Sequence, residues 1–408
     1  MVTVTVKWNC GVVVEGSDTS LILDPTSFNP SYTYALITHS HSDHSRGFKL
    51  PYSKKLSTKE TYDLASLYKS NIEGWEPVYF RRKIRLGEFE VEAHNAGHIL
   101  GSVIYEVITQ EGNIVYTGDL NPIRTLTMRE AEITPCDILI IDSTFGSPSF
   151  IFPPREELYV KIVKWALRSL SEGRIPTFQT DSIGNAQELV TLLNRMTKLE
   201  VLVHPSIARV NKVYERYGYD LSYIDMKLDE AIDLAPKDKC ALVLPKRAKL
   251  PNKIKLNVAL VSGWALYLRD GRVPIPLSDH ADFPALIDFI RETKPKIVLS
   301  FHGGKQNVIL ANYIRRKLGI KAMPIREATV SIPTDEGKGK SGFNDFKSCE
   351  NALLRVIRMR GFTYNRRWIS AILRRKGYSQ SRIDEALDNL IRRGVLRLLS
   401  PEGKFELR

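Results

Sequence analysis

The feature that most limits how this chain can fold is a run of metal-binding side chains directly after an apolar segment. Residues 34–37 read YALI, and the next seven residues, THSHSDH, place four candidate ligands within six positions. An apolar run that ends in such a loop indicates a buried strand whose end carries the ligands. Imidazole and carboxylate groups suit zinc and related first-row ions. The four candidate ligands are His39, His41, Asp43 and His44.

Two later segments offer further ligands in similar surroundings. His98 lies in NAGHILGS, where small residues on both sides let the backbone turn, and Asp119 follows the strand-like run NIVYTG. Taken singly, each position is equally well explained as a hydrogen-bonded core histidine or a turn aspartate. Their order and spacing after HSHSDH favour metal binding.

These segments carry a resemblance to a known family. HSHSDH, AGHILGS and YTGDLN resemble the successive metal motifs of the metallo-β-lactamase fold. DSTFG at 142–146, LSDHADF with His280 and SFHGG with His302 resemble motifs A, B and C of its β-CASP nuclease subfamily. GNAQEL at 184–189 is similar to a phrase in the inserted domain of that subfamily. The resemblance covers about residues 1–330, and six of the eight histidines lie in its motifs.

The resemblance implies a dinuclear metal site with two Zn²⁺ per chain, and Mn²⁺ is the alternative. One ion would be held by His39, His41 and His98, the second by Asp43, His44 and His302, and both by Asp119. Paired ions supply a nucleophile from water at neutral pH and neutralise charge on phosphoryl oxygens.

The resemblance also implies a proton donor. His280 would protonate the leaving oxygen, because an imidazole titrates near neutrality, and Asp142 would hydrogen-bond and orient it. The alternative for Asp142 is a strand-end aspartate that caps the following turn. The candidate catalytic residues are therefore His280, Asp142 and Asp119.

The implied fold is a metallo-β-lactamase αββα sandwich with an inserted β-CASP α/β domain and a C-terminal winged helix. Strand-like text through the first 145 residues and strand–helix alternation after Pro153 agree with it. The predicted boundaries are 1–149 and 273–333 for the sandwich, 150–272 for the insert, 334–343 for a linker and 344–408 for the tail. In the insert, PREELYVKIVKWALRSLSEG predicts a helix with apolar positions at Val160, Val163, Leu167 and Leu170.

The tail is strongly basic. Residues 344–408 contain 15 Lys and Arg against 7 Asp and Glu, which gives +8 of the total net charge of +13. This charge favours a polyanionic partner such as nucleic acid, and a solvated basic surface is the alternative. Helical patterns near 347–360, 366–376 and 381–393 and a terminal hairpin predict the winged helix, with Ser381 as N-cap of the last helix.

Charge placement in the tail favours phosphate contact over base readout. The last predicted helix carries acidic Asp384, Glu385 and Asp388, whereas the preceding one is basic at Arg366, Arg367, Arg374, Arg375 and Lys376. Docking to a protein partner is the alternative role for this module.

The sequence predicts a cytosolic protein. No apolar run approaches the ~20 residues of a membrane span, and the N-terminal MVTVTVKWN alternates like a strand, unlike a secretory signal. The cysteines follow neither a disulfide framework nor a thiolate zinc pattern, which indicates a reducing compartment. They are Cys10, Cys136, Cys240 and Cys349.

A nuclease acting on a single strand in an active-site cleft is the predicted function, and DNA is favoured over RNA. STFGSP, SGWAL and LSDHADF look most like a prokaryotic group of ligase-associated exonucleases and mRNA 3′-end processing factors. Asp142 is typical of the DNA branch of β-CASP enzymes and His302 of the RNA branch, so a ribonuclease of RNA maturation or decay stays open. A small-molecule metallohydrolase and a catalytically inactive scaffold are further alternatives, and the long insert and the filled ligand positions argue against them.

Overall fold

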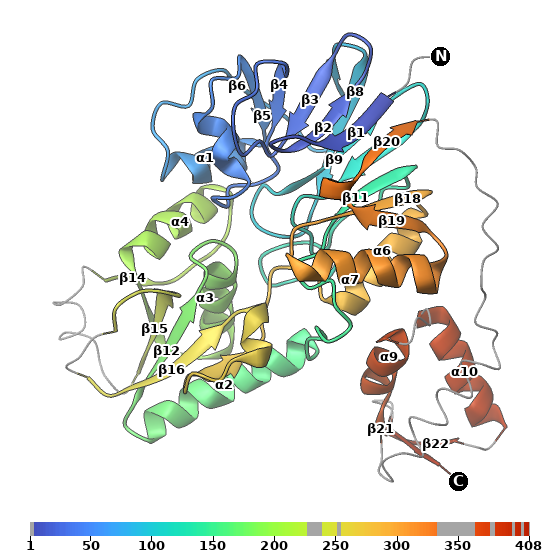
Figure 1. Ribbon diagram of the computed structural model, residues 1–408. Coiled ribbons are helices and arrows are strands. Elements are labelled where there is room, and N and C mark those ends of the chain that lie inside the picture. Colours follow the sequence, from blue (N-terminus) through green and yellow to red (C-terminus); the bar gives the residue numbers. More distant parts are fainter. Residues whose placement is uncertain are drawn as a thin grey trace.

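The computed structural model describes residues 4–226, 239–250, 254–332, 364–375, 380–393, 396–400 and 404–407. These residues form two seven-stranded sheets, one six-stranded sheet and one three-stranded sheet (Figure 1). The predicted linker at 334–343, the predicted helix at 347–360, Cys349 and Lys376 lie outside the described residues. Within the described ranges, no helix combines the length and the apolar character needed to cross a membrane.

The two seven-stranded sheets form the main body. The first has the order β20-β1-β2-β3-β4-β5-β6 and the second β19-β18-β11-β10-β9-β8-β7. In the first sheet the strands are β1 Val4–Trp8, β2 Val12–Glu15, β3 Ser20–Leu23, β4 Tyr34–Leu36, β5 Lys54–Ser57, β6 Trp75–Pro77 and β20 Thr329–Ile332. In the second they are β7 Ile84–Leu86, β8 Phe89–Asn95, β9 Val103–Ile108, β10 Asn113–Tyr116, β11 Ile138–Asp142, β18 Ile297–Phe301 and β19 Lys321–Pro324.

A shared apolar core joins these two sheets. Val6 and Leu21 of the first sheet and Tyr105, Ile140 and Leu299 of the second belong to one buried cluster. The outer face of the second sheet is covered by α6 (Phe283–Thr293) and α7 (Lys305–Tyr313), which continues into the short η3 (Ile314–Leu318). The helix α1 (Lys59–Ser66) packs beside the first sheet. These helix–sheet–sheet–helix layers agree with the predicted mixed α/β sandwich.

The six-stranded sheet is entirely parallel and has the order β14-β13-β15-β12-β16-β17. The helices α2 (Arg155–Ser171), α3 (Asn185–Met196) and α4 (Pro205–Arg216) pack on one of its faces. Its last strand lies just beyond residue 272, where the sequence placed a domain boundary. The strands are β12 Ile175–Thr180, β13 Glu200–Val203, β14 Ile224–Asp225, β15 Cys240–Pro245, β16 Leu256–Val261 and β17 Val273–Ile275.

The helix α2 exists as predicted, but its expected apolar face was partly wrong. Val160 and Leu167 are 42% and 49% exposed, whereas Leu158 and Ile162 are buried against the six-stranded sheet. Both sets have helical spacing, because α2 carries apolar residues over a wide arc. The position of the sheet, which periodicity does not encode, selects the buried set.

The described part of the tail contains two helices and a small antiparallel sheet of order β21-β23-β22. The helices are α9 Arg366–Arg375 and α10 Gln380–Arg392, and the strands are β21 Tyr364–Asn365, β22 Leu396–Ser400 and β23 Lys404–Leu407. The two last helices and the hairpin were predicted in these places. Ser381 was predicted as N-cap, but α10 already begins at Gln380, whose amide donates to Asp384 (2.9 Å). The side chains of Ser381, Arg366, Arg367 and Arg375 lie outside the described residues.

Candidate metal centre

The predicted ligands lie where strands of the main body end. The strand β4 leads into His39, β10 leads into Asp119, and β18 is followed at once by His302. His98 lies in the loop between β8 and β9. Because β10, β11 and β18 are neighbouring parallel strands, their carboxyl ends bring these side chains to one edge of the sheet.

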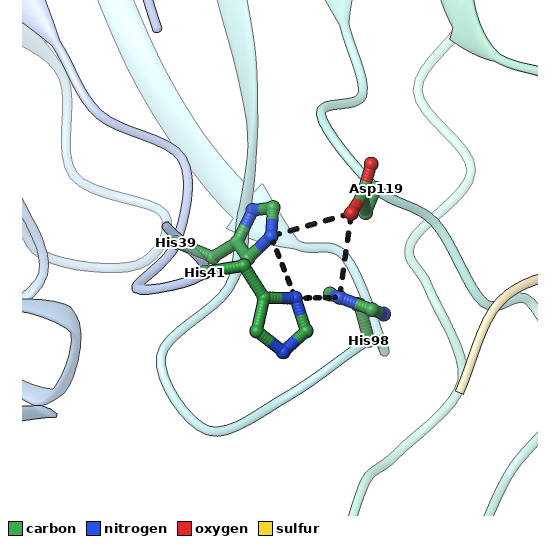
Figure 2. Close-up of side chains that lie close together, drawn as sticks. All are labelled: His39, His41, His98 and Asp119. Atoms are coloured by element: carbon green, nitrogen blue, oxygen red, sulfur yellow. Dashed lines mark hydrogen bonds and ion pairs between the residues drawn. The ribbon is translucent and has the colours of Figure 1, made fainter. Parts of the chain in front are cut away.

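Four of the predicted ligands form a first group: His39, His41, His98 and Asp119 (Figure 2). His41 Nδ1 lies 3.2 Å from His39 Nε2 and 3.0 Å from His98 Nε2. Asp119 Oδ2 lies 3.3 Å from His39 Nε2 and 3.6 Å from His98 Nε2. The four ligand atoms therefore converge on one point, as a tetrahedral ion requires.

The other three predicted ligands form a second group: Asp43, His44 and His302. The rings of His44 and His302 lie 4.7 Å apart, and His44 Nε2 is 4.0 Å from Asp43 Oδ2. Asp119 connects the two groups, because its Oδ1 atom lies 3.2 Å from His44 Nε2 while its Oδ2 atom faces the first group. His302 adopts a φ of 64°, an unusual backbone for a non-glycine residue and one that recurs at functional sites.

The donor set fits bound cations. His44 Nε2 and Asp119 Oδ1 are buried and have no hydrogen-bond partner among the described residues. A buried polar atom without a hydrogen-bond partner costs free energy of folding. The imidazole nitrogens that face one another in these groups also share no hydrogen-bond donor. Divalent ions between the two groups would satisfy these atoms together. The nitrogen and carboxylate donors suit zinc and also permit manganese.

Asp24 supports this centre and was missed by the sequence analysis. Its Oδ2 atom lies 2.6 Å from His44 Nδ1 and accepts hydrogen bonds from Thr38 Oγ1 (2.7 Å) and the Tyr116 hydroxyl (2.9 Å). Such a contact fixes the tautomer and direction of a ligating histidine. One signal was available, because Asp24 follows the buried strand β3 just as Asp119 follows β10.

Burial sets the protonation of the first group. It lowers the pKa of His39 well below its usual value and that of His98 to about 3. Burial alone would raise the pKa of Asp119, but the imidazoles that face it hold that pKa well below the ordinary range. Neutral imidazoles at His39 and His98 beside an ionised Asp119 are protonation states that ligate a metal. In the second group burial lowers the pKa of His44, but the charges of Asp119 and Asp24 outweigh it and raise that pKa well above its usual value.

His280 and Asp142 lie together, as predicted, beside the shared carboxylate. His280 Nδ1 is 2.9 Å from Asp142 Oδ2, and His280 Nε2 is 3.8 Å from Asp119 Oδ2. Burial lowers the pKa of His280, but Asp119 and Asp142 outweigh it and raise the pKa to about 10. The two carboxylates therefore favour the protonated ring, whose Nε2 atom faces the candidate ligand Asp119.

Asp142 also caps the turn that follows its strand, which was the alternative role considered for it. Its Oδ1 atom accepts hydrogen bonds from the Thr144 backbone N–H (2.8 Å) and Thr144 Oγ1 (2.7 Å). The carboxylate thus caps the following turn with one oxygen and holds His280 with the other. One side chain makes both contacts, because a carboxylate has two acceptor atoms.

Asp279 is a second residue that the sequence analysis missed. Its backbone carbonyl lies 2.9 Å from His98 Nδ1, which directs His98 Nε2 to the first group. Its Oδ2 atom is buried and has no partner among the described residues. Asp279 immediately precedes His280, so one loop orients a candidate ligand and carries the candidate proton donor.

A cavity of about 330 Å³ opens onto the centre between the main body and the six-stranded sheet. The main body contributes His41, Asp119 and His302 to its wall, and residues around that sheet contribute Asn185, Lys246 and Trp264. Lys246 is paired with Asp181 (2.6 Å). The nearby cationic residues Arg247 and Lys249 do not line this cavity.

The two remaining histidines have structural contacts away from this centre. His94 Nε2 lies 2.9 Å from Glu106 Oε2, so this histidine has a hydrogen-bonded, structural contact. His204, given no role from the sequence, caps α4 by accepting from the Ser206 backbone N–H (3.2 Å).

Known proteins similar to this chain include a probable DNA ligase of Opitutus terrae, 26% identical over 333 residues, which are 76% of this chain and 32% of the ligase. An RNase J-like protein of Methanocaldococcus jannaschii is 25% identical, over 73% of this chain and 88% of its own length. RNase aCSPSF2 of Saccharolobus solfataricus is 24% identical, over 66% of this chain and 64% of its own length. No protein-family model matches the chain.

A solved structure from Enterococcus faecalis, of a protein of unknown function, shares the fold with a TM-score of 0.59. It is 16% identical and covers 81% of this chain and 100% of its own length. The chain spans about a third of the probable DNA ligase and most of the RNase J-like protein. These similarities support the resemblance to the β-CASP metallo-β-lactamase family that the motifs showed.

Proposed function

We propose that this protein is a dinuclear-metal nuclease of the β-CASP type that hydrolyses phosphodiester bonds, and that it is a DNA exonuclease of repair or end processing. One observation carries the proposal. Two groups of candidate ligand side chains share Asp119, and His280, held by Asp142, faces the same carboxylate across the same cavity. This arrangement offers two cation sites and a proton donor to a single phosphate.

In this proposal His39, His41 and His98 would hold one Zn²⁺ or Mn²⁺ ion, Asp43, His44 and His302 would hold the other, and Asp119 would contribute to both sites. The ions supply Lewis acidity and a nucleophile from water at neutral pH. Asp24 and Asp279 keep His44 and His98 directed at the ions. The ligands thereby stay in place while the substrate exchanges.

The chain itself supplies the proton that the departing sugar oxygen needs. His280 keeps Nδ1 on Asp142 and presents Nε2 to the cavity, so its free N–H points at the leaving oxygen of a phosphate held at the centre. When that N–H gives up its proton, the Asp142 carboxylate keeps the ring in the same orientation. A water molecule then returns the proton to His280 for the next cycle.

The substrate class rests on the relatives and on the tail. A relative with the name of a DNA ligase favours DNA whose ends are trimmed before sealing. The ribonuclease names of two other relatives support the second candidate, a ribonuclease of RNA maturation or decay. A small-molecule hydrolase is the weaker candidate, because the cavity is walled by a separate α/β unit.

The tail supports a polymeric substrate. We assign it as a winged helix that binds nucleic-acid backbone with its net charge of +8, and a protein partner is the alternative ligand. It contacts the main body through Arg374, whose guanidinium lies 3.0 Å from Asp288 of α6. Because α6 begins three residues after His280, a strand bound by the tail would lie near the active site.

The direct test is cleavage of matched 5′-labelled single-stranded DNA and RNA by wild type and His280→Ala, with Zn²⁺ or Mn²⁺. DNA cleavage by wild type, with a loss of about 100-fold or more in His280→Ala, is the expected result. The product ladder separates exonuclease from endonuclease action and gives the polarity. His204→Asn is the control, since asparagine also caps helices and position 204 is remote from the centre.

Each other outcome corrects a stated part of the proposal. Cleavage of RNA alone replaces DNA by the second candidate. Equal rates for wild type and His280→Ala remove His280 as the proton donor. Absence of cleavage of both polymers with both metals contradicts the nuclease proposal.

A further inference from the structure

Trp264 places a large exposed aromatic ring at the rim of the metal centre. The buried strand β16 ends at Val261, and the chain then turns into the short 3₁₀ helix η2, Gly263–Tyr267, which carries Trp264. Trp264 is 47% exposed and lines the same cavity as Asp119, His280 and His302. Exposed aromatic rings are common singly on surfaces, so its surroundings decide whether this one has a role.

The ring of Trp264 is held in one position by aromatic neighbours. Its centroid lies 5.0 Å from that of Phe145, tilted by 52°, and 5.4 Å from that of Phe150, at 83°. Gly263 makes this packing possible, because a Cβ atom there would lie 2.4 Å from Phe145 Cζ. The protein therefore keeps part of an indole exposed and oriented, and little conformational entropy remains to be lost when a flat ligand stacks on it.

Phe145 connects this ring to the chemistry. It is buried, and its centroid lies 5.9 Å from that of His280 with the planes at 87°. Trp264 is thus on the side of the cavity where the proton donor lies, and the leaving oxygen departs on that side. On the same wall Asn185 is 1% exposed, and its Oδ1 atom has no hydrogen-bond partner among the described residues.

We propose that Trp264 forms a nucleobase subsite, on which the base of the nucleoside carrying the leaving oxygen stacks. The inference rests on the proposed nuclease function and adds to it the position of one nucleotide. Bases of every kind have a π face, so the subsite accepts all four, and sequence-independent digestion follows. The unpartnered amide oxygen of Asn185 accepts a hydrogen bond from the sugar or base of the same nucleotide.

A cycle that combines a protein change with a substrate change tests this subsite. A set of strands, each with a single abasic nucleotide at a different position, is digested separately with wild type, Trp264→Ala and Trp264→Phe. In wild type we expect cleavage to slow roughly 5- to 150-fold where the abasic unit occupies the leaving side. Trp264→Ala should cut intact strands slower by a similar factor and be insensitive to the abasic position. Trp264→Phe should keep most of the rate and the sensitivity.

Tyr267→Ala is the matched control, because Tyr267 lies on the same short helix, is 49% exposed and lines a different cavity. It should keep the abasic sensitivity. The proposal is overturned if Trp264→Ala cuts intact strands at the wild-type rate. It is also overturned if the abasic effect persists in that variant, or occurs only on the side that keeps the phosphate.

A binding measurement separates this proposal from the proposed function. Chelator-treated protein cuts nothing, yet a thymidine oligonucleotide should quench part of its tryptophan fluorescence on stacking. Trp264→Phe should lose that quenching and keep the circular dichroism of the wild type. Quenching without DNA or RNA cleavage by the metal-loaded wild type would contradict the nuclease and keep the subsite. Cleavage with identical quenching in wild type and Trp264→Phe would contradict the subsite alone.

Discussion

Single carboxylates with several simultaneous contacts govern the candidate centre at the scale of residues. The Asp24 carboxylate accepts hydrogen bonds from the Thr38 and Tyr116 hydroxyls and also contacts His44 Nδ1. In Asp24→Asn an amide replaces one oxygen, so the contact to His44 Nδ1 weakens. We expect the affinity for the second ion to fall about 10- to 100-fold, measured by metal titration of chelator-stripped protein. Asp18→Asn, at an exposed position, is the control, and equal affinities in both variants would contradict this role.

His94 gives a pH dependence that lies outside the metal centre. Burial lowers the pKa of His94, but the hydrogen bond and charge of Glu106 outweigh it, so the folded-state pKa is raised. The stabilisation is therefore complete below the unfolded pKa and disappears as the pH rises through the folded one. We expect the free energy of unfolding to drop by roughly 1–2 kcal/mol in His94→Gln at pH 6 and by less at pH 9. Equal losses at both pH values would exclude a charged pair.

Local sequence was sufficient to predict which side chains form the two candidate ligand groups, but not the residues that contact them. HSHSDH places four donors in six positions, and all of them lie in the two ligand groups. Asp24 and Asp279 stand alone in the sequence, and their contacts arise from chain crossings that no local pattern encodes. The sequence indicated Trp264 only as part of the segment SGWAL. It gave no sign that the ring is exposed, because that exposure depends on the turn at Gly263.

At the scale of elements, one buried ion pair joins the α/β unit to the candidate proton donor. Arg155 of α2 donates two hydrogen bonds to Glu188 of α3 (2.6 and 2.7 Å) and one to the Ser278 carbonyl, two residues before His280. Both side chains are nearly inaccessible to solvent. The pair therefore holds the His280 loop against two helices.

Arg155→Met should leave Glu188 buried without its partner. We expect a loss of about 3–5 kcal/mol in the free energy of unfolding, measured by urea denaturation. Arg168→Met removes an exposed pair with Glu172 on the same helix and should cost about 0–1 kcal/mol. Similar losses in the two variants would show that the buried pair does not link these elements.

Periodicity predicted α2, yet it assigned half of the α2 face wrongly. Helical spacing fixes which residues share a side, whereas the packing partner fixes which side is buried. In VALVSGWAL the strand β16 ends at Val261, before Ser262 and Gly263, and the close approach of Gly263 to Phe145 accompanies the turn into η2.

At the scale of the whole molecule, the two-sheet body and the parallel α/β unit together form the cavity at the candidate centre. The two-sheet body supplies the ligands, the parallel α/β unit supplies Trp264 and Asn185, and the basic tail contacts α6 through Arg374. The order of motifs along the chain predicted the layered body and the separate α/β unit. The contact between the tail and α6 was not predictable, because it joins two segments with no shared motif.

The most direct test of the central claim is the metal content of the protein. Chelator-stripped wild type, dialysed against buffered Zn²⁺ or Mn²⁺ and analysed by mass spectrometry, should contain two ions per chain. His302→Ala should retain one ion, because the first group stays intact, and His204→Asn should retain two. One ion or none in wild type, or two ions in His302→Ala, would contradict a dinuclear centre built from these side chains.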